Sequence, residues 1–387
     1  MKEAVIVSGV RTPIGKYGGM LTPFEDYELG GMVVKEAVKR AGIDPSLITE
    51  VYMGNAEGIP GNLGRIVALE ADLPETVPGI QLDRQCASGL ETINMAAAMI
   101  QSGHGDVYVA GGAESQSNNP YFLSKAKRAY VYDAPPFIPL RMSPPKIGDP
   151  PMGVTAENVL EVHPVSREKM DKFALRSHER MAKAKKEGFY DDMILPLEYT
   201  KRGKTIVLDQ DECPRDDANL ESMAKLRPIF KKDGSVTAGN SCPMNDGAAA
   251  VVVMSKEKAD ELKIPYMLKI VDFASFGLDP HVMGFGPIGA VKKLLDKTGV
   301  SLDEVAHIEL NEAFASQAIG CIEELGLDEE RVNPYGGAIS HGHPLGATGA
   351  ILTIKAAYAM KKADRKYAIV TMCVGGGEGA AALFERP

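Results

Sequence analysis

Three reactive side chains stand out in this chain of 387 residues because of where they lie. Cys86 begins the run Cys-Ala-Ser-Gly and comes just before a long apolar segment. His343 stands between a glycine and a proline, and Cys373 is followed, after one intervening residue, by three consecutive glycines. Two thiols and an imidazole are the groups needed to move an acyl group through a thioester of cysteine.

Cys86 is expected at or just before the start of a helix over residues 87–101. Unpaired N–H groups and the helix dipole stabilise a thiolate at such a position, which lowers the pKa of the thiol from about 8.5. The same N–H groups can hold the oxyanion of a thioester under attack. The competing interpretation is a small buried side chain, which is the usual place of a free cysteine.

An internal duplication relates the surroundings of these residues. Three pairs of segments correspond: 86–100 with 346–360, 107–114 with 368–377, and 246–254 with 378–384. In the second copy the glycine loop runs directly into the last strand, whereas residues 116–240 intervene in the first copy. The simplest account is two related α/β halves with a long insertion in the first half.

The duplication places His343 in the second half opposite Cys86 in the first half. If the halves pack around a pseudo-twofold axis, the two helix starts meet and His343 lies within reach of the thiol as its base. Pro344 suits the first turn of the helix that follows. His341, two residues earlier, is the competing candidate for the base.

Cys373 ends a predicted buried strand, and two functions are open to it. It could be a second thiol that moves protons, or the glycines after it could form a phosphate loop. The glycine spacing is not that of a nucleotide-binding fingerprint and a strand follows the loop, which disfavours the phosphate loop. Asn311 follows another strand and could either cap the next helix or orient a water at the site.

Short β-branched segments alternate with amphipathic helices in both halves, which favours mixed or parallel sheets covered by helices. Strands are predicted over 4–8, 50–53, 107–110, 249–254, 307–310 and 367–373. Helices are predicted over 27–41, 87–101, 289–298, 312–324 and 346–361. In the insertion, seven prolines between residues 129 and 152 argue against a regular element, and a helix over 167–187 follows, with Ser166 as its N-cap.

Composition limits the class of protein. The chain is 44% hydrophobic and 25% charged, which is typical of a globular protein with two or three subdomains. No segment approaches the roughly 20 apolar residues of a membrane span. The N-terminus leaves no room for a signal peptide before the first strand, and the C-terminus carries no peroxisomal or retention signal. Five cysteines without metal-ligand spacing predict a reduced, cytoplasmic protein without a metal.

Charge is distributed unevenly along the chain. The net charge of -9 argues against a general nucleic-acid binder. The insertion, 116–240, nevertheless holds 21 Lys+Arg and 18 Asp+Glu, so this segment is slightly positive while the remainder is strongly negative. Solvated helix faces explain most of these lysines, but a basic segment also suits an anionic ligand.

Taken in order, these motifs resemble those of the thiolase family, and the resemblance runs from residue 11 to the C-terminal glycine loop. The hallmarks lie at 85–90, 110–115, 152–158, 311–315, 342–344 and 373–377. The resemblance implies duplicated α/β halves in an αβαβα layering with an inserted loop domain. It places the halves at 1–115 with 241–266 and at 267–387, and the loop domain at 116–240.

The resemblance also implies a role for each reactive group. Cys86 would be the acylated nucleophile and His343 the base that activates it. Cys373 would take the α-proton of acetyl-CoA in synthesis, or protonate the acetyl carbanion in cleavage. Asn311, through a water, and His343 would form one oxyanion hole, and the N–H groups of Cys86 and Gly375 the other. Two holes are needed because the enolate and the tetrahedral oxyanion arise in separate steps.

The loop domain would hold coenzyme A as co-substrate. By the same resemblance, Arg215 and Phe230 match positions that contact the nucleotide end, and Ala238 matches one on the pantetheine path. Met152 would approach the acyl pocket, and Phe314 completes the set of implied contacts.

Three features depart from the family pattern. Cys242 stands where the family usually has a serine that bonds to pantetheine, and a thiol is a weaker donor. Pro151 replaces the histidine of short-chain biosynthetic members, and the Pro-rich segment 129–150 does not resemble their tetramer-forming loop. Acyl-chain preference and assembly, homodimer or homotetramer, therefore stay open.

The resemblance implies an enzyme that condenses two acetyl-CoA or cleaves 3-ketoacyl-CoA, with ping-pong kinetics through an acyl-enzyme. One alternative is a decarboxylating ketoacyl synthase acting on an acyl carrier protein. Loss of CO₂ makes the carbanion without the base that Cys373 would supply, which disfavours this alternative. Another is a non-catalytic CoA-binding protein, against which the intact Cys86 and His343 stand. The implied partners are acyl-CoA and CoA, with no nucleic acid, no membrane and no resident cofactor.

Overall fold

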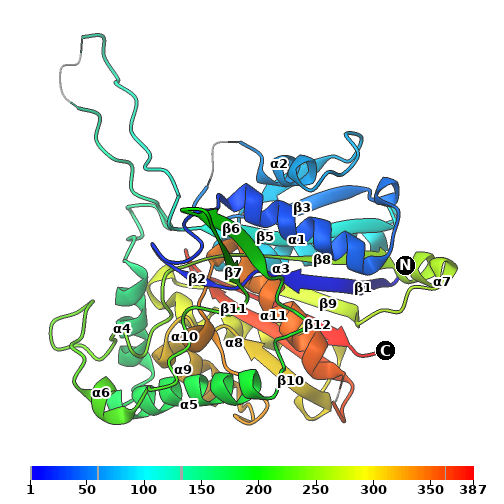
Figure 1. The fold of residues 1–387 in the computed structure, drawn as a ribbon. Coiled ribbons are helices and arrows are strands. Elements are labelled where there is room, and N and C mark those ends of the chain that lie inside the picture. The colour runs from blue at the N-terminus through cyan, green and yellow to red at the C-terminus, as the bar shows by residue number, and fades with distance from the viewer. Residues whose placement is uncertain (1, 59–60, 131–133, 362) are drawn as a thin grey trace.

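The computed structural model describes residues 2–58, 61–130, 134–361 and 363–387, and within them ten strands form one mixed sheet (Figure 1). The order is β10-β11-β12-β9-β1-β8-β5-β3-β4, with β2 paired to β8. The first half supplies β1 (Ala4–Arg11), β2 (Gly15–Lys16), β3 (Glu50–Gly54), β4 (Gly79–Leu82), β5 (Val107–Ser115) and β8 (Asn245–Ser255). The second half supplies β9 (Leu268–Gly277), β10 (Val305–Leu310), β11 (Tyr367–Val374) and β12 (Glu378–Glu385).

Strand pairing repeats in the two halves, as the duplication predicts. β5 is parallel to β3 and antiparallel to β8, and β11 is parallel to β10 and antiparallel to β12. β1 and β9 then extend the two copies on the far side of β8 and β12. The copies join where β1 and β9 pair antiparallel over three residues of β1, 4–6.

Helices cover the outer face of each half of the sheet and also lie between the halves. On the outer face of the first half, α1 (Asp26–Ala41) and α2 (Leu63–Glu70) pack into one core. On the outer face of the second half, α8 (Gly286–Thr298) and α9 (Ala315–Leu325) pack into another. Between the halves lie α3 (Ser88–Gln101) and α11 (Leu345–Met360), which pack against each other and against both copies of the sheet. The predicted αβαβα layering is therefore confirmed.

The middle layer follows from the sequence of α11. Apart from the buried Lys355, its residues are apolar, small or threonine around the whole helix, and all but two are buried, as expected for a helix with no solvent-facing side. Glycines let it approach α3 at the first turn. A Cβ atom on Gly89 would lie 2.6 Å from the carbonyl oxygen of Gly346, and one on Gly349 would lie 2.1 Å from the nitrogen of Leu90. The helix starts therefore meet backbone to backbone.

The insertion adds a mostly helical unit and a projecting arm. Its elements are α4 (Met152–Val162), α5 (Arg167–Lys186), the hairpin of β6 (Leu197–Lys201) with β7 (Lys204–Leu208), and α6 (Leu220–Ala224). The hydroxyl of Ser166 accepts from the N–H of Lys169 and caps α5, as predicted. Between β5 and α4 the chain extends away from the body as a long arm (Figure 1). The described part of the Pro-rich segment forms no helix or strand; residues 131–133 of it lie outside the described residues.

Two boundaries differ from prediction near the reactive residues. The helix predicted from residue 312 begins at Ala315, so Asn311 does not cap it and that interpretation is wrong. The reason is tertiary: the N–H of Asn311 continues the pairing of β10 with β11 by donating to the carbonyl oxygen of Thr371 at 3.0 Å. Pro344 is the N-cap of α11 and lies one residue before its first turn. The remaining helices are α7 (Lys256–Leu262) and α10 (Ala338–His341).

Candidate active site

Cys86 lies on a single 3₁₀ turn, Gln85–Ala87, directly ahead of α3, as predicted. The turn begins with Gln85 at φ +46°, an uncommon conformation for a residue with a side chain. Local hydrogen bonds hold it: Gln85 donates its N–H to Asp83 at 2.7 Å, and the hydroxyl of Ser88 donates to the carbonyl of Gln85 at 2.7 Å. This turn contacts both α11 and β11, so Cys86 lies where the second half approaches the first.

Cys86 is half-buried. Burial raises the pKa of its thiol to about 11, although the backbone N–H groups of Gly375 and of Cys86 itself act to lower this pKa. Asp83 and Glu114 raise this pKa further through their charge. The predicted lowering of the pKa is therefore wrong, because loss of water outweighs two N–H groups. The thiol is protonated at neutral pH and needs a base.

His343 is buried, and its hydrogen bonds fix the protonation of the ring. The hydroxyl of Thr348 donates to the carbonyl of Pro344 at 2.8 Å, so it can only accept from Nδ1 of His343, 2.7 Å away. The proton therefore sits on Nδ1 and the lone pair on Nε2, which also lies 3.3 Å from Nδ2 of Asn311. Burial lowers the pKa of His343 to about 4. The imidazole is neutral at physiological pH, with its basic nitrogen facing Asn311.

His341 is committed to a different, fully buried network. Its Nδ1 donates to the carbonyl of Gly342 at 2.8 Å, and its Nε2 accepts from Nζ of Lys355 at 3.4 Å. Lys355 also donates to Glu309 at 3.0 Å. Burial, and then the charge of Lys355, hold the pKa of His341 well below its usual value. Both ring nitrogens are occupied, so His341 has no free base to offer.

Cys373 ends β11 and is fully buried in a small cluster that also contains Phe314. Cys242 and Met152 pack against the same cluster. Burial first, and then the neighbouring thiols of Cys86, Cys321 and Cys242, raise the pKa of Cys373 well above its usual value. Cys373 is therefore a protonated thiol rather than a thiolate.

Asn311 presents its amide to this region. Its Nδ2 lies against His343, whereas its buried Oδ1 accepts no hydrogen bond from any residue that the structure describes. A buried carbonyl oxygen of this kind requires a donor. A water whose O–H bonds to Oδ1 would satisfy it and present its second O–H to a ligand.

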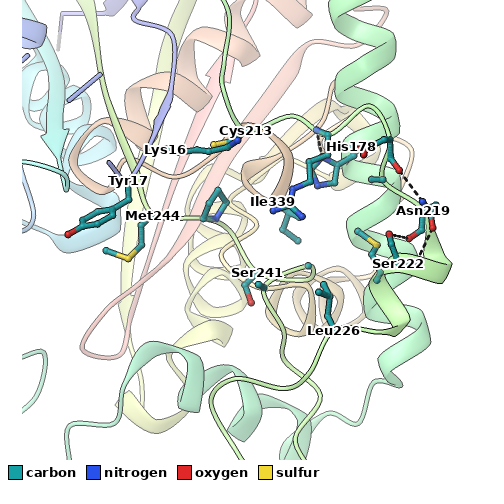
Figure 2. A pocket seen from close by; sticks show the side chains of 17 residues that line it. Lys16, Tyr17, His178, Cys213, Asn219, Ser222, Leu226, Ser241, Met244 and Ile339 are labelled. Atoms are coloured by element: carbon teal, nitrogen blue, oxygen red, sulfur yellow. Dashed lines mark hydrogen bonds between the residues drawn. The ribbon is translucent and has the colours of Figure 1, made fainter. Parts of the chain in front are cut away.

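A cavity of about 700 Å³ opens between the insertion and the first half, with Ile339 of the second half on its wall (Figure 2). Figure 2 shows Lys16 and Cys213 on its upper wall and Ser241 and Leu226 on its lower wall. Arg215 and Ala238 also line it, and the N–H of Arg215 donates to His178 at 3.3 Å. Its size is that of a pocket for a large ligand, and its two cationic side chains, Lys16 and Arg215, against one carboxylate, Asp217, favour an anionic one.

The predicted coenzyme A contacts fall into two groups. Arg215 and Ala238 line the cavity, whereas Met152, Cys242 and Phe314 lie with Cys373. Phe230 lies beside the second group, because its ring packs edge-on against that of Phe314 with the ring centroids 6.2 Å apart. The segment 238–244 connects the groups, since Ala238 and Met244 line the cavity and Cys242 donates its N–H to the carbonyl of Ala313 at 3.0 Å.

Sequence reasoning missed several residues of the site. Thr348, which fixes the ring of His343, and Lys16 and Tyr17, which line the cavity, were not singled out. A signal existed for Thr348, because it lies within the duplicated segment that follows His343. For Lys16 and Tyr17 the only signal was that they lie soon after residue 11, where the resemblance to the thiolase family begins.

The described part of the chain contains no group of three or more His, Cys, Asp or Glu side chains suited to holding a metal ion. It also has no helix with the length and apolar character needed to span a bilayer.

Comparison with known proteins agrees with this geometry. A model of the thiolase N-terminal domain matches residues 4–257, and a model of the thiolase C-terminal domain matches residues 264–386. The chain is 45% identical over 400 residues to the 3-ketoacyl-CoA thiolase of Bacillus subtilis, covering 100% of both chains. It is 41% identical over 393 residues to beta-ketothiolase BktB of Cupriavidus necator, covering 100% of this chain and 99% of that one.

The fold agrees equally well with a solved structure. The crystal structure of the acetyl-CoA acetyltransferase of Bacillus anthracis superimposes with a TM-score of 0.95 at 40% identity, covering 100% of this chain and 99% of the other. Matched from end to end in sequence and in fold, with its reactive thiols and imidazole gathered where two related halves meet, this chain belongs to the thiolase family of acyltransferases.

Proposed function

We propose that this thiolase exchanges acyl groups between coenzyme A thioesters through an acyl-enzyme at Cys86. The reaction is acyl-CoA + acetyl-CoA ⇌ 3-ketoacyl-CoA + CoA, with acetoacetyl-CoA or a longer 3-ketoacyl-CoA as the substrate for cleavage. One observation carries the proposal: the turn of Cys86 contacts both α11, which begins just after His343, and β11, which ends beside Cys373.

In the cleavage direction, His343 takes the proton of Cys86 at Nε2 while the sulfur attacks the 3-keto carbon. Both groups start neutral, since their pKa values are about 4 and about 11, so the proton moves as the carbon–sulfur bond forms. Breaking the bond between the α- and keto-carbons releases acetyl-CoA as a carbanion, which takes the proton of Cys373. The raised pKa of Cys373 keeps that proton available.

The second half-reaction restores all three groups. The thiolate of Cys373 takes the proton of incoming CoA, whose sulfur attacks the acyl-enzyme. Cys86 leaves as thiolate and recovers its proton from the imidazolium of His343. Every proton is thus returned, and the kinetics are ping-pong because acetyl-CoA departs before CoA reacts.

Two sets of donors serve the two anionic intermediates. The N–H groups of Cys86 and Gly375 both act to lower the pKa of the Cys86 thiol, which supports them as donors to the tetrahedral oxyanion formed beside the sulfur. For the enolate oxygen of acetyl-CoA we propose His343 together with a water bonded to Asn311. The buried Oδ1 of Asn311, which no described residue satisfies, supports this water.

Coenzyme A is proposed to lie in the cavity and to extend along the segment 238–244 to the thiols. Lys16 and Arg215 suit the phosphates at the nucleotide end, and Ala238 lines the path inward. In this division the insertion, 116–240, is the domain that holds coenzyme A. The halves are 1–115 with 241–266 and 267–387.

We further propose a cytoplasmic homo-oligomer, dimer or tetramer, that needs no resident cofactor. All five cysteines are free thiols, which suits a reducing compartment. The arm carries large apolar side chains that face solvent, among them Tyr121 and Tyr130 at 83% and 90% exposure. Such a surface favours contact with a second copy.

The purified protein is expected to cleave acetoacetyl-CoA when CoA is added, with acetyl-CoA as product. The assay follows loss of the 3-ketoacyl thioester, and 3-ketoacyl-CoA of increasing chain length are compared in the same way. Cys86→Ser provides the control and should lose nearly all turnover. No turnover with any chain length would contradict the proposed function.

Cys373→Ser should separate the two half-reactions. Acylation of Cys86 expels CoA, whose thiol has a pKa of about 8.5 and can depart as thiolate without the proton of Cys373, so acylation should continue, whereas exchange of the acetyl methyl protons with solvent should stop. Deuterium incorporation into acetyl-CoA measures the exchange, and mass spectrometry measures the acylation. Exchange that continues at the wild-type rate would remove Cys373 from its role.

Thr348→Val should slow acylation of Cys86 by about 10-fold, because Nδ1 of His343 loses the acceptor that keeps its proton in place. Thr353→Val is a matched control, since Thr353 is equally buried and its hydroxyl donates to the carbonyl four residues earlier at 2.8 Å, as that of Thr348 does. Acylation rates of both variants are compared with wild type by rapid quench. Equal rates for the two would show that Thr348 does not act through the imidazole.

A further inference from the structure

Asn245, the first residue of β8, is fully buried and uses every polar group that it has. Its Oδ1 accepts from the backbone N–H of His343 at 2.8 Å. Its Nδ2 donates to the carbonyl of Gly15 at 2.7 Å and reaches the sulfur of Cys213 at 3.0 Å. Its own N–H donates to the side chain of Gln116 at 2.7 Å.

These partners leave the amide only one orientation. The N–H of His343 can only donate and the carbonyl of Gly15 can only accept, so exchanging Oδ1 and Nδ2 would break both hydrogen bonds. Asn245 is therefore held as a rigid plane between two segments that are more than three hundred residues apart in the chain.

The loop that carries His343 packs against the side-chain amide of Asn245. Gly342 has φ +107°, and a Cβ atom built on it would lie 2.7 Å from the amide atoms of Asn245. The backbones of Met244 and His343 also form a short parallel bridge. Contact at Gly342 and the hydrogen bond at His343 together fix how far this loop can approach the thiols.

The other end of the amide faces the cavity wall. Cys213, which accepts from Nδ2, lines the cavity together with Lys16 and Arg215. One side chain thus contacts both the backbone of the base and the wall of the cavity proposed for coenzyme A. Of these two contacts, the hydrogen bond to His343 bears directly on the chemistry.

We propose that Asn245 is a positioning residue for the thiolase reaction: its amide sets where the imidazole of His343 stands relative to Cys86. The inference rests on the proposed role of His343 as base. Asn245 touches no reacting atom and acts through the backbone of His343. A displacement of about 1 Å in a catalytic group can cost about 100-fold in rate. Losing the hydrogen bond between Asn245 and the backbone of His343 should therefore lower the turnover rate measurably.

The test compares Asn245→Ala, Asn245→Asp and Asn55→Ala with wild type in cleavage of acetoacetyl-CoA. Asn245→Ala removes the acceptor for His343, and kcat should fall about 10- to 100-fold while KM changes less than kcat. Asn245→Asp keeps the shape and the acceptor, and because burial raises the pKa of its carboxyl, the protonated form can still donate to the carbonyl of Gly15; its kcat should therefore recover to well above that of Asn245→Ala. If Asn245→Ala does not fold, Asn245→Ser takes its place, because its hydroxyl is too short to reach both partners.

Asn55→Ala is the matched control for burial. Asn55 is also fully buried and uses both ends of its amide. Its Oδ1 accepts from the N–H of Gly58 at 2.8 Å, and its Nδ2 donates to the carbonyl of Ala113 at 3.0 Å. Its loss should lower the melting temperature as the loss of Asn245 does. It should not reproduce the selective fall in kcat.

A second readout does not depend on turnover. Alkylation of Cys86 by iodoacetamide, quantified by peptide mass spectrometry, should be about 10-fold slower in Asn245→Ala and near the wild-type rate in Asn55→Ala. If wild type cleaves no 3-ketoacyl-CoA, the proposed function fails while alkylation still decides the role of Asn245. Asn245→Ala with wild-type alkylation, or Asn245→Asp as slow as Asn245→Ala in both assays, would overturn the inference.

Discussion

The site depends on the close approach of two helix starts, those of α3 and α11. Without glycine at 89 and 349 the first turns could not touch backbone to backbone, and the loops ahead of them would stay apart. Glu114 also holds the start of α11 in place. Its buried carboxylate accepts from the N–H of Gly346 at 2.8 Å and from that of Ala56 at 2.8 Å. Cys86 and His343 each stand three residues before a glycine of this contact, so packing of the helices brings the residues together.

Burial then decides the chemical state of the gathered groups. Loss of water raises the pKa of Cys86 to about 11 and lowers that of His343 to about 4, so at rest Cys86 is a thiol and His343 a neutral imidazole. A resting ion pair would be costly in such surroundings. The N–H groups of Cys86 and Gly375 instead become most useful when charge develops during attack, which is how a preorganised polar site lowers a barrier.

Much of this arrangement could be predicted from sequence because the duplication carried spatial information. Pairing the segment of Cys86 with that of His343 predicted two related α/β halves and the meeting of the helix starts, while the resemblance to thiolases implied the layering of the halves. What could not be predicted depends on partners distant in sequence. The amide of Asn245 matters only because His343 folds onto it, and the later start of α9 follows from the bond between Asn311 and Thr371. The pKa of Cys86 was mispredicted because sequence reveals a helix start but not how much water surrounds it.

The most direct measurement is the site and rate of acylation. The protein is mixed with acetyl-CoA, quenched in acid and mapped by peptide mass spectrometry. The acetyl group should appear on Cys86 alone among the five cysteines, and His343→Asn should slow its appearance by about 100-fold or more. An acetyl group on Cys242 or Cys373 in place of Cys86, or acylation at an unchanged rate in His343→Asn, would contradict the account.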